Sequence, residues 1–396
     1  MALITMVNLG ISFVFNWLLL RRLGASTESD AVFAALIVPQ AIIMILATVT
    51  GKALAPHLAS LSAEDQRGGA WEMAQIAFLF FCLAAWILEA TSHHWVGVFF
   101  GAYSSVARAM TERLVETFVW LLPVQAVLSV AQGLAYAQGR FFRAELSGLL
   151  GSIAGLTLLL VFLPIWGGAG YARASLLRAV VSAGALVGVL GPFQRVRFRS
   201  SLPGFLWKRM GILTGGAFLY KMTYLVDRVL SALAPAGGLS LFQVSQQFYG
   251  AGEVVLQKAI SGPVLARMAG HLREGDERGA EALYRGGVRK TVFLAVGIIF
   301  FLVLFGLPAL RLIFYGGRLS DGDIRLLWLL LLALGGQLLS PVVLALSNRY
   351  YALGIPGPPP GSDSSEFPFR LRFGLYFSVT GVYGVWRWPR GSITGF

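Results

Sequence analysis

The chain has 396 residues, of which 56% are hydrophobic and only 13% are charged, and its mean hydropathy is +0.70. A soluble globular protein carries close to a quarter charged residues because its surface must be solvated. The composition therefore excludes an ordinary soluble protein and indicates a surface that faces lipid.

The net charge of +13 raises nucleic acid as a class of partner. Lys and Arg, however, lie mostly between the hydrophobic runs and do not form one basic face, which argues against a nucleic-acid groove. This spacing is typical of side chains that anchor a membrane protein against anionic headgroups, so membrane lipids are the expected surroundings. The four histidines and the single Cys82 show no metal-ligand spacing, and no cofactor is predicted.

A spanning helix needs about 20 mostly apolar residues. By this criterion the sequence predicts an all-α, polytopic transmembrane helical bundle with about ten spans. The N-terminus lacks a basic segment and a small-residue cleavage site, so we expect its first apolar run to remain as a membrane helix. The predicted spans are 4–20, 31–50, 73–90, 114–138, 146–166, 172–190, 205–233, 239–264, 291–313 and 324–346.

The basic residues predict how the chain is oriented in the membrane. Loops after the even-numbered spans are richer in Lys and Arg than the alternate loops, so the positive-inside rule places them and the N-terminus in the cytoplasm. The charged, helix-prone stretch 265–289 is expected either to lie along the cytoplasmic surface or to form a solvated linker.

The spans group into two pseudo-repeated lobes. Residues 1–193 form an N-terminal lobe with spans one to six, 194–204 a basic cytoplasmic linker, and 205–354 an incomplete C-terminal lobe with spans seven to ten. The ends of spans four and ten share a Tyr-Ala-x-Gly motif, which supports an internal duplication. Residues 355–396 form an atypical tail that opens with a Pro/Gly/Ser cluster; we expect a disordered tail or a lost reading frame there.

Polar residues gather on one face of the eighth span. At 100° per residue they fall within an arc of roughly 140°, and a lipid-facing helix would not place amides, a carboxylate and an ammonium on one stripe. A wet substrate cavity is the favoured interpretation, and a structural hydrogen-bond network between helices is the alternative. The residues assigned to the cavity are Gln243, Gln247, Glu253, Gln257 and Lys258.

The first span repeats this pattern more weakly, with Asn8, Ser12 and Asn16 on one face; a cavity and ordinary helix packing are equally good interpretations. In the seventh span, Lys221 and Arg228 share a side and could hold an anionic group such as a phosphate. The alternative for Arg228 is an interfacial position where it reaches water. Asp30 could cap the helix that it begins or could serve the mouth of the cavity.

No nucleophile–base pair, carboxylate dyad, phosphate loop or metal cluster emerges, so an enzyme is not predicted. The chain resembles the lipid II flippases of the MurJ/MviN type, in the superfamily that also contains polysaccharide flippases and multidrug extruders. The resemblance rests on several loose motifs whose order and spacing agree over residues 8–354. They are Gly24-Ala-Ser-Thr-Glu-Ser-Asp-Ala-Val-Phe-Ala-Ala35 with Pro39, Ala53-Leu-Ala-Pro-His-Leu58, Leu121-Leu-Pro123, Gly133-Leu-Ala-Tyr-Ala-Gln-Gly-Arg-Phe-Phe142, Val226-Asp-Arg-Val-Leu-Ser-Ala-Leu233 and Arg349-Tyr-Tyr-Ala-Leu-Gly354.

The resemblance implies an alternating-access flippase in the bacterial cytoplasmic membrane, with a central cavity formed by spans one, two, seven and eight. Asp30 matches the aspartate of the family motif. Family cavity arginines are replaced here by Leu9, Phe15, Ile43, Met44 and Gln247. Those arginines are the expected partners of the lipid diphosphate, so Lys221, Arg228 and Lys258 are hypothesised to supply the missing charge.

The leading functional prediction is a flippase for a lipid-linked oligosaccharide or peptidoglycan precursor, with a polyprenyl-diphosphate-linked glycan as substrate. A cation-coupled exporter of small amphipathic compounds and a truncated, non-transporting membrane protein are the alternatives. A coupling ion or the membrane potential stays open as the source of energy.

Overall fold

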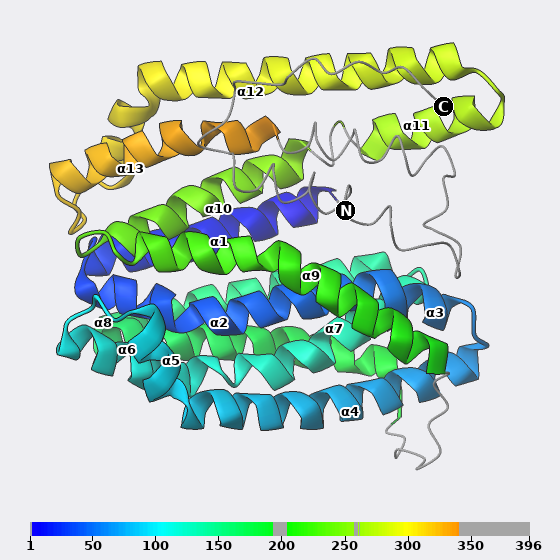
Figure 1. The fold of residues 1–396 in the computed structure, drawn as a ribbon, viewed down its shortest axis with the longest axis horizontal. Helices are drawn as coiled ribbons and strands as arrows, with labels where there is room; N and C mark the ends of the chain where they lie inside the picture. The colour runs from blue at the N-terminus through cyan, green and yellow to red at the C-terminus, as the bar shows by residue number, and fades with distance from the viewer. Residues whose placement is uncertain (1, 193–203, 257–259, 261, 340–396) are drawn as a thin grey trace, which may run out of the picture.

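A computed structural model describes residues 2–192, 204–256, 260 and 262–339, and within them the chain is helical with no strand (Figure 1). Predictions for Gln257, Lys258, the end of the tenth span and the tail 355–396 lie outside the described residues. The helices are α1 Ala2–Leu23, α2 Thr27–Val49, α3 Ala55–Ala59, α4 Ala63–Ala90, α5 Ser92–Phe99, α6 Ser105–Phe118, α7 Leu121–Ala137, α8 Phe141–Leu190, α9 Gly204–Ser231, α10 Gly238–Leu256, α11 Gly262–Arg273, α12 Glu277–Ile313 and α13 Asp321–Ala333.

Six helical stretches in the described part are long and apolar enough to cross a membrane. Three of them, with 33, 50 and 36 residues, are much longer than one crossing requires, because about 20 residues span the hydrocarbon core. The predicted number of about ten spans stays a prediction. The six stretches are Ile4–Leu23, Thr27–Val49, Asp65–Ala90, Ser105–Ala137, Phe141–Leu190 and Arg278–Ile313.

The 50-residue α8 is two helices joined at Gly167, whose φ of 53° and ψ of −129° are not helical. The two halves pack against each other in antiparallel order, because Gly155 lies against Arg178 and Gly151 lies against Ser182. We call these halves the α8 hairpin; they correspond to the predicted spans 146–166 and 172–190. Glycine is needed at these crossings because no side chain fits between the backbones.

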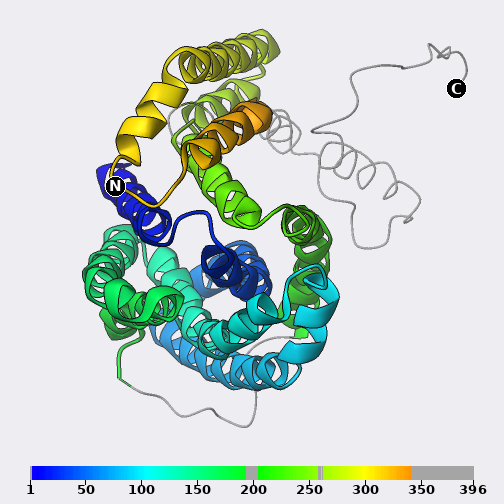
Figure 2. The ribbon, with the colours of Figure 1, turned by 90° about the vertical axis from the view of Figure 1, so that its left-hand side faces the viewer.

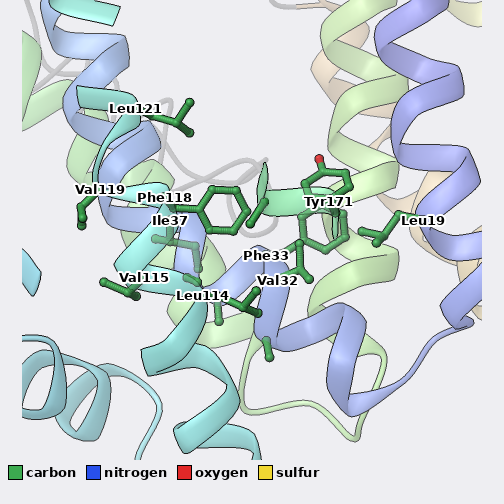
Figure 3. Close-up of a cluster of buried hydrophobic side chains, with 14 of the residues drawn as sticks. Leu19, Val32, Phe33, Ile37, Leu114, Val115, Phe118, Val119, Leu121 and Tyr171 are labelled. Atoms are coloured by element: carbon green, nitrogen blue, oxygen red, sulfur yellow. The ribbon is translucent and has the colours of Figure 1, made fainter. Parts of the chain in front are cut away.

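Helix α2 lies inside the N-terminal bundle and contacts α1, α6, α7 and α8 (Figure 2). Its inner residues are apolar and fully buried. They pack with Tyr171 of the α8 hairpin, whose ring lies 6.3 Å from the Phe33 ring and 6.4 Å from the Phe118 ring between centroids (Figure 3). This aromatic and aliphatic core fixes α2 relative to the other helices.

A second group of helices packs around α10. Helix α13 and the 3₁₀ turn Leu334–Leu339 cover one side of α10, and α12 packs on α13. Helix α12 leaves its outer side chains exposed, with Phe293 77% and Phe300 63% accessible, as expected of a lipid-facing helix.

Helix α9 lies along α2 and also touches the π-helical turn Thr50–Leu54. Its Leu206 is buried among side chains of the N-terminal bundle, and Leu225 packs against the core around α2. The predicted lobe boundary at 194–204 divides the chain, whereas in space α9 borders the N-terminal bundle. The division into lobes therefore stays a prediction.

The charged stretch 265–289 forms α11, a turn at Gly275 and the first turns of α12. Asp276 caps α12 by accepting a hydrogen bond from the Gly279 N–H at 2.8 Å. This bond and the neighbouring His271 ring hold the pKa of the Asp276 carboxyl below its usual value.

Replacing Gly155 by alanine should destabilise the α8 hairpin. A Cβ atom at this position would lie 2.7 Å from the Cβ of Arg178, and such overpacking costs about 1–3 kcal/mol. The matched control is Gly184→Ala in the same helix, where no atom lies within 4 Å of the added methyl. Thermal unfolding in detergent measures both variants. Equal stability of the two would contradict the packing of the hairpin.

Candidate substrate-translocation site

Residues at the start of α2 cap the N-termini of three helices. The N-terminus of α2 itself is capped by the reciprocal pair Ser26 and Ser29. The Glu28 carboxylate accepts a hydrogen bond from the Gly168 N–H at 2.7 Å, which caps the second half of the α8 hairpin. Asp30 caps α10: its two carboxylate oxygens accept the N–H groups of Gly237 at 2.7 Å and of Ser240 at 2.8 Å.

The position of Asp30 follows from the chemistry of helix ends. The first N–H groups of a helix have no partner inside it, and the helix dipole favours a negative charge there. Asp30 is only 4% exposed, and a carboxylate with this little access to water needs such donors. Asp30 therefore caps a helix, but the capped helix is α10 and not α2. Its assignment to the mouth of a cavity stays a prediction.

Further contacts hold the two helix groups together at this end of the bundle. The Arg318 N–H donates to the carbonyl of Arg21 at 3.0 Å, and the Trp17 indole donates to the carbonyl of Ile313 at 3.0 Å. Gly24, with a φ of 73°, leaves no room for a side chain next to the Arg318 backbone. The loop between α12 and α13 therefore packs against the loop between α1 and α2.

The polar stripe of α1 forms hydrogen bonds on both of its sides. Toward the α8 hairpin, Asn8 accepts from Ser152, and Asn16 accepts from the Tyr171 hydroxyl at 2.5 Å. Toward α10, the Asn16 amide donates to the Gln247 side chain at 2.6 Å, and the Gln247 amide donates to the Ser12 carbonyl at 2.9 Å.

The structure thus brings together Asn8, Ser12, Asn16 and Gln247 from the predicted set. Their hydrogen bonds are those of the packing alternative, in which polar side chains join helices. The same groups could exchange these partners for water or a headgroup, and their assignment to a cavity stays a prediction.

Arg178 is a member of this network that the sequence analysis did not single out. Its guanidinium donates to the Ser12 hydroxyl at 2.8 Å and lies 5.7 Å from the centre of the Phe15 ring. No carboxylate within the described part of the chain forms a salt bridge with it. An arginine in the interior of an apolar span is costly and marks a functional site by default. The sequence shows this arginine inside the predicted apolar span 172–190.

Two sets of polar contacts between α9 and α10 contain charged residues. Arg228 is 6% exposed, donates to the Gln243 side chain at 2.9 Å and stacks 3.4 Å from the centre of the Tyr224 ring. The Lys221 ammonium and the Glu253 carboxylate interact electrostatically across the two helices. Lys221 and Glu253 are both half-buried. Arg228 is therefore enclosed, which does not fit the interfacial alternative.

The arrangement supplies polar and cationic groups between helices α1, α8, α9 and α10. Within the described part of the chain no group of three or more His, Cys, Asp or Glu residues could hold a metal. Side chains of these kinds bind ligands reversibly through hydrogen bonds and charge.

Solved structures of transporters are similar to this fold. A lipid II flippase MurJ in an inward closed conformation has a TM-score of 0.80 at 14% identity, with 96% of this chain and 80% of that chain covered. An inward-facing multidrug resistance MATE family transporter of the MOP superfamily has a TM-score of 0.70 at 17% identity, covering 89% and 81%. A MOP superfamily transporter from Pyrococcus furiosus has a TM-score of 0.61 at 16% identity, covering 89% and 81%.

These similarities confirm the predicted fold class, an all-α polytopic helical bundle. No curated protein sequence matches the chain. The family model of the lipid II flippase MurJ matches residues 20–356. This match confirms the resemblance found in the sequence and the prediction that the protein is not an enzyme. The chain is a multi-pass membrane protein that belongs to the lipid II flippase MurJ family.

Proposed function

We propose that this protein moves a polyprenyl-diphosphate-linked glycan, such as a peptidoglycan precursor, across the bacterial cytoplasmic membrane by alternating access. The observation that carries the proposal is the set of charged and polar groups inside the spanning bundle, at the seam between α1, α8, α9 and α10. Moving sugars and phosphates through hydrocarbon is prohibitively costly, so a headgroup needs such a polar route while its lipid tail stays in the bilayer.

The cations suit an anionic headgroup. Arg178 and Arg228 present guanidinium groups, which bind phosphate oxygens in a bidentate manner, and Lys221 adds a compact charge. In the described structure the Arg178 guanidinium donates to the Ser12 hydroxyl and lies near the Phe15 ring. A diphosphate would replace the hydroxyl with a counter-charge, and Arg228 and Lys221 would exchange Gln243 and Glu253 for the same ligand.

Asp30 would act as the latch between two access states. An N-terminus in the cytoplasm places the first turn of α2 at the outer face, so the capped α10 corresponds to a form closed toward the outside. Breaking the bonds from Gly237 and Ser240 would free α10 to move away from α2. Because the latch joins helices of the two lobes, its opening and closing would couple to their rocking motion.

Export of small amphipathic compounds is the second candidate, favoured by the likeness to MATE transporters. The Glu253 carboxylate, which interacts with Lys221, could then bind a coupling cation. The two candidates differ in substrate chemistry, and a protein that has lost transport would move neither class.

Transport by reconstituted protein should depend on the half-buried cations Arg178 and Lys221. Proteoliposomes loaded with a short-chain polyprenyl-diphosphate disaccharide should show flipping that Arg178→Gln and Lys221→Ala each reduce about tenfold or more. A lost hydrogen bond to a charged group contributes about 1.5–3 kcal/mol, and every 1.4 kcal/mol is tenfold. Arg173→Gln is the matched control, because Arg173 is exposed over the Trp166 ring in the same hairpin.

The outcomes of this assay separate the candidates. If the disaccharide is flipped at the same rate with and without both substitutions, Arg178 and Lys221 do not bind the substrate. Transport of an organic cation dye without flipping of the disaccharide would favour the exporter. Transport of neither compound would favour a non-transporting protein.

Replacing Asp30 by asparagine should open the contact between α2 and α10 at the outer face of the protein. Asparagine keeps one acceptor oxygen but loses the charge, so the latch weakens by about 1.5–3 kcal/mol and the opened population rises about tenfold or more. The readout is modification of Ala25→Cys, next to Gly237, by an impermeant maleimide in a Cys82→Ser background. Thr27→Ala in the same turn serves as the control. Equal labelling rates with Asp30 and Asn at position 30 would refute the latch.

A further inference from the structure

A hollow lies between the two halves of the α8 hairpin, at the end of the bundle where α8 begins. Its volume is about 300 Å³. The first half contributes Arg143, Leu146, Ser147 and Leu150, and the second half contributes Ala185, Gly188 and Val189. This hollow is separate from the seam, because α1 contacts a different side of the first half of α8, at Gly148 and Ser152.

The hollow has an apolar wall and a basic mouth. Leu146, Leu150 and Val189 line it, and the Ser147 hydroxyl is already bonded to the carbonyl of Ala144 at 2.8 Å. Arg143 is exposed at the beginning of α8, and no carboxylate within the described residues forms a salt bridge with it.

A second guanidinium lies close to the same end of the hairpin. The side chain of Arg67 comes within 3.6–3.9 Å of the position that a Cβ atom would take at Gly191, the residue that ends α8. Arg67 therefore adds positive charge near this end of the hairpin, while Arg143 is the cation that lines the hollow itself.

The face around the hollow is one that lipid would cover. On the first half of α8, Leu150 is 44% and Ile153 is 47% exposed, and both lie within a helical stretch apolar enough to span the membrane. A basic pocket between spanning helices on the cytoplasmic side is the kind of site that holds an anionic headgroup. The predicted orientation puts Arg143 on that side.

We propose that this hollow binds one anionic phospholipid, with its phosphate at Arg143 and an acyl chain along Leu146, Leu150 and Val189. The charge of the mouth selects an anionic over a zwitterionic headgroup, and the small residues Ala185 and Gly188 leave the space for the chain. The site goes beyond the proposed transport, because the lipid is a bound ligand on the outer face of the hairpin and not the translocated substrate.

Two substitutions test the two parts of the site separately. Arg143→Gln removes the charge of the mouth. Gly188→Leu fills the hollow without strain, because no atom lies within 4 Å of a Cβ placed there. Gly184→Leu is the matched control: it adds the same side chain one turn away, also in open space and outside the residues that line the hollow. Arg173→Gln, at the far end of the hairpin, controls for loss of one exposed arginine.

The measurement is native mass spectrometry of the purified full chain, titrated with dioleoylphosphatidylglycerol or dioleoylphosphatidylcholine. The wild-type protein should retain one phosphatidylglycerol in preference to phosphatidylcholine. Arg143→Gln should weaken that binding about fivefold, the factor expected for one cation near the membrane surface. Gly188→Leu should also lose the bound lipid, whereas both control variants should retain it.

Three results would overturn the proposal. The first is equal retention of the two lipids by the wild-type protein. The second is unchanged binding in Gly188→Leu, which would assign any selectivity to surface charge alone. The third is an equal loss of bound phosphatidylglycerol in Gly184→Leu. That result would mean that any large side chain on this face of the helix weakens lipid binding, whether or not it fills the hollow.

Discussion

The carboxylate of Asp30 on the first N–H groups of α10 is the interaction on which the arrangement of the two helix groups depends. A charge with 4% exposure inside a membrane protein persists only where donors compensate for lost water. The start of α10 supplies two such donors. Because Glu28 caps the α8 hairpin from the same turn, α2 positions both the N-terminal bundle and α10.

Helix α1 completes this connection with side chains that can change partners. Its Asn16 bonds to Tyr171 on one side and to Gln247 on the other, so it belongs to both helix groups at once. Neutral hydrogen bonds of this kind contribute about 1 kcal/mol each and are readily exchanged for water or ligand groups. Weak bonds of this kind are what the proposed alternating access requires, because they can break and form again as the helices move.

The family match assigns the protein to a family, whereas the chemistry of the site bears on the proposed binding of an anionic headgroup. The match to the lipid II flippase family covers most of the chain and assigns the protein to that family. The resemblance in sequence implies that the cations of this chain stand at other positions than those of the family. Arg178 reaches the Ser12 hydroxyl from the α8 hairpin, and the small Gly155 makes room for its stem. A change in which helix carries the charge can preserve the binding of an anion, because electrostatic attraction depends on position in space and not on position in sequence.

The sequence by itself determined the class of fold, because low charge and long apolar runs permit only a bundle of spanning helices. It also identified polar residues such as Asn16 and Arg228, since polar groups stand out against an apolar helix. What only the tertiary structure decided was which groups meet. Asp30 reaches α10 across 207 residues, and Asn16 reaches Gln247 across 231. Helical periodicity describes one helix at a time, so it could place Asp30 on a helix end but could not tell which helix that carboxylate would cap.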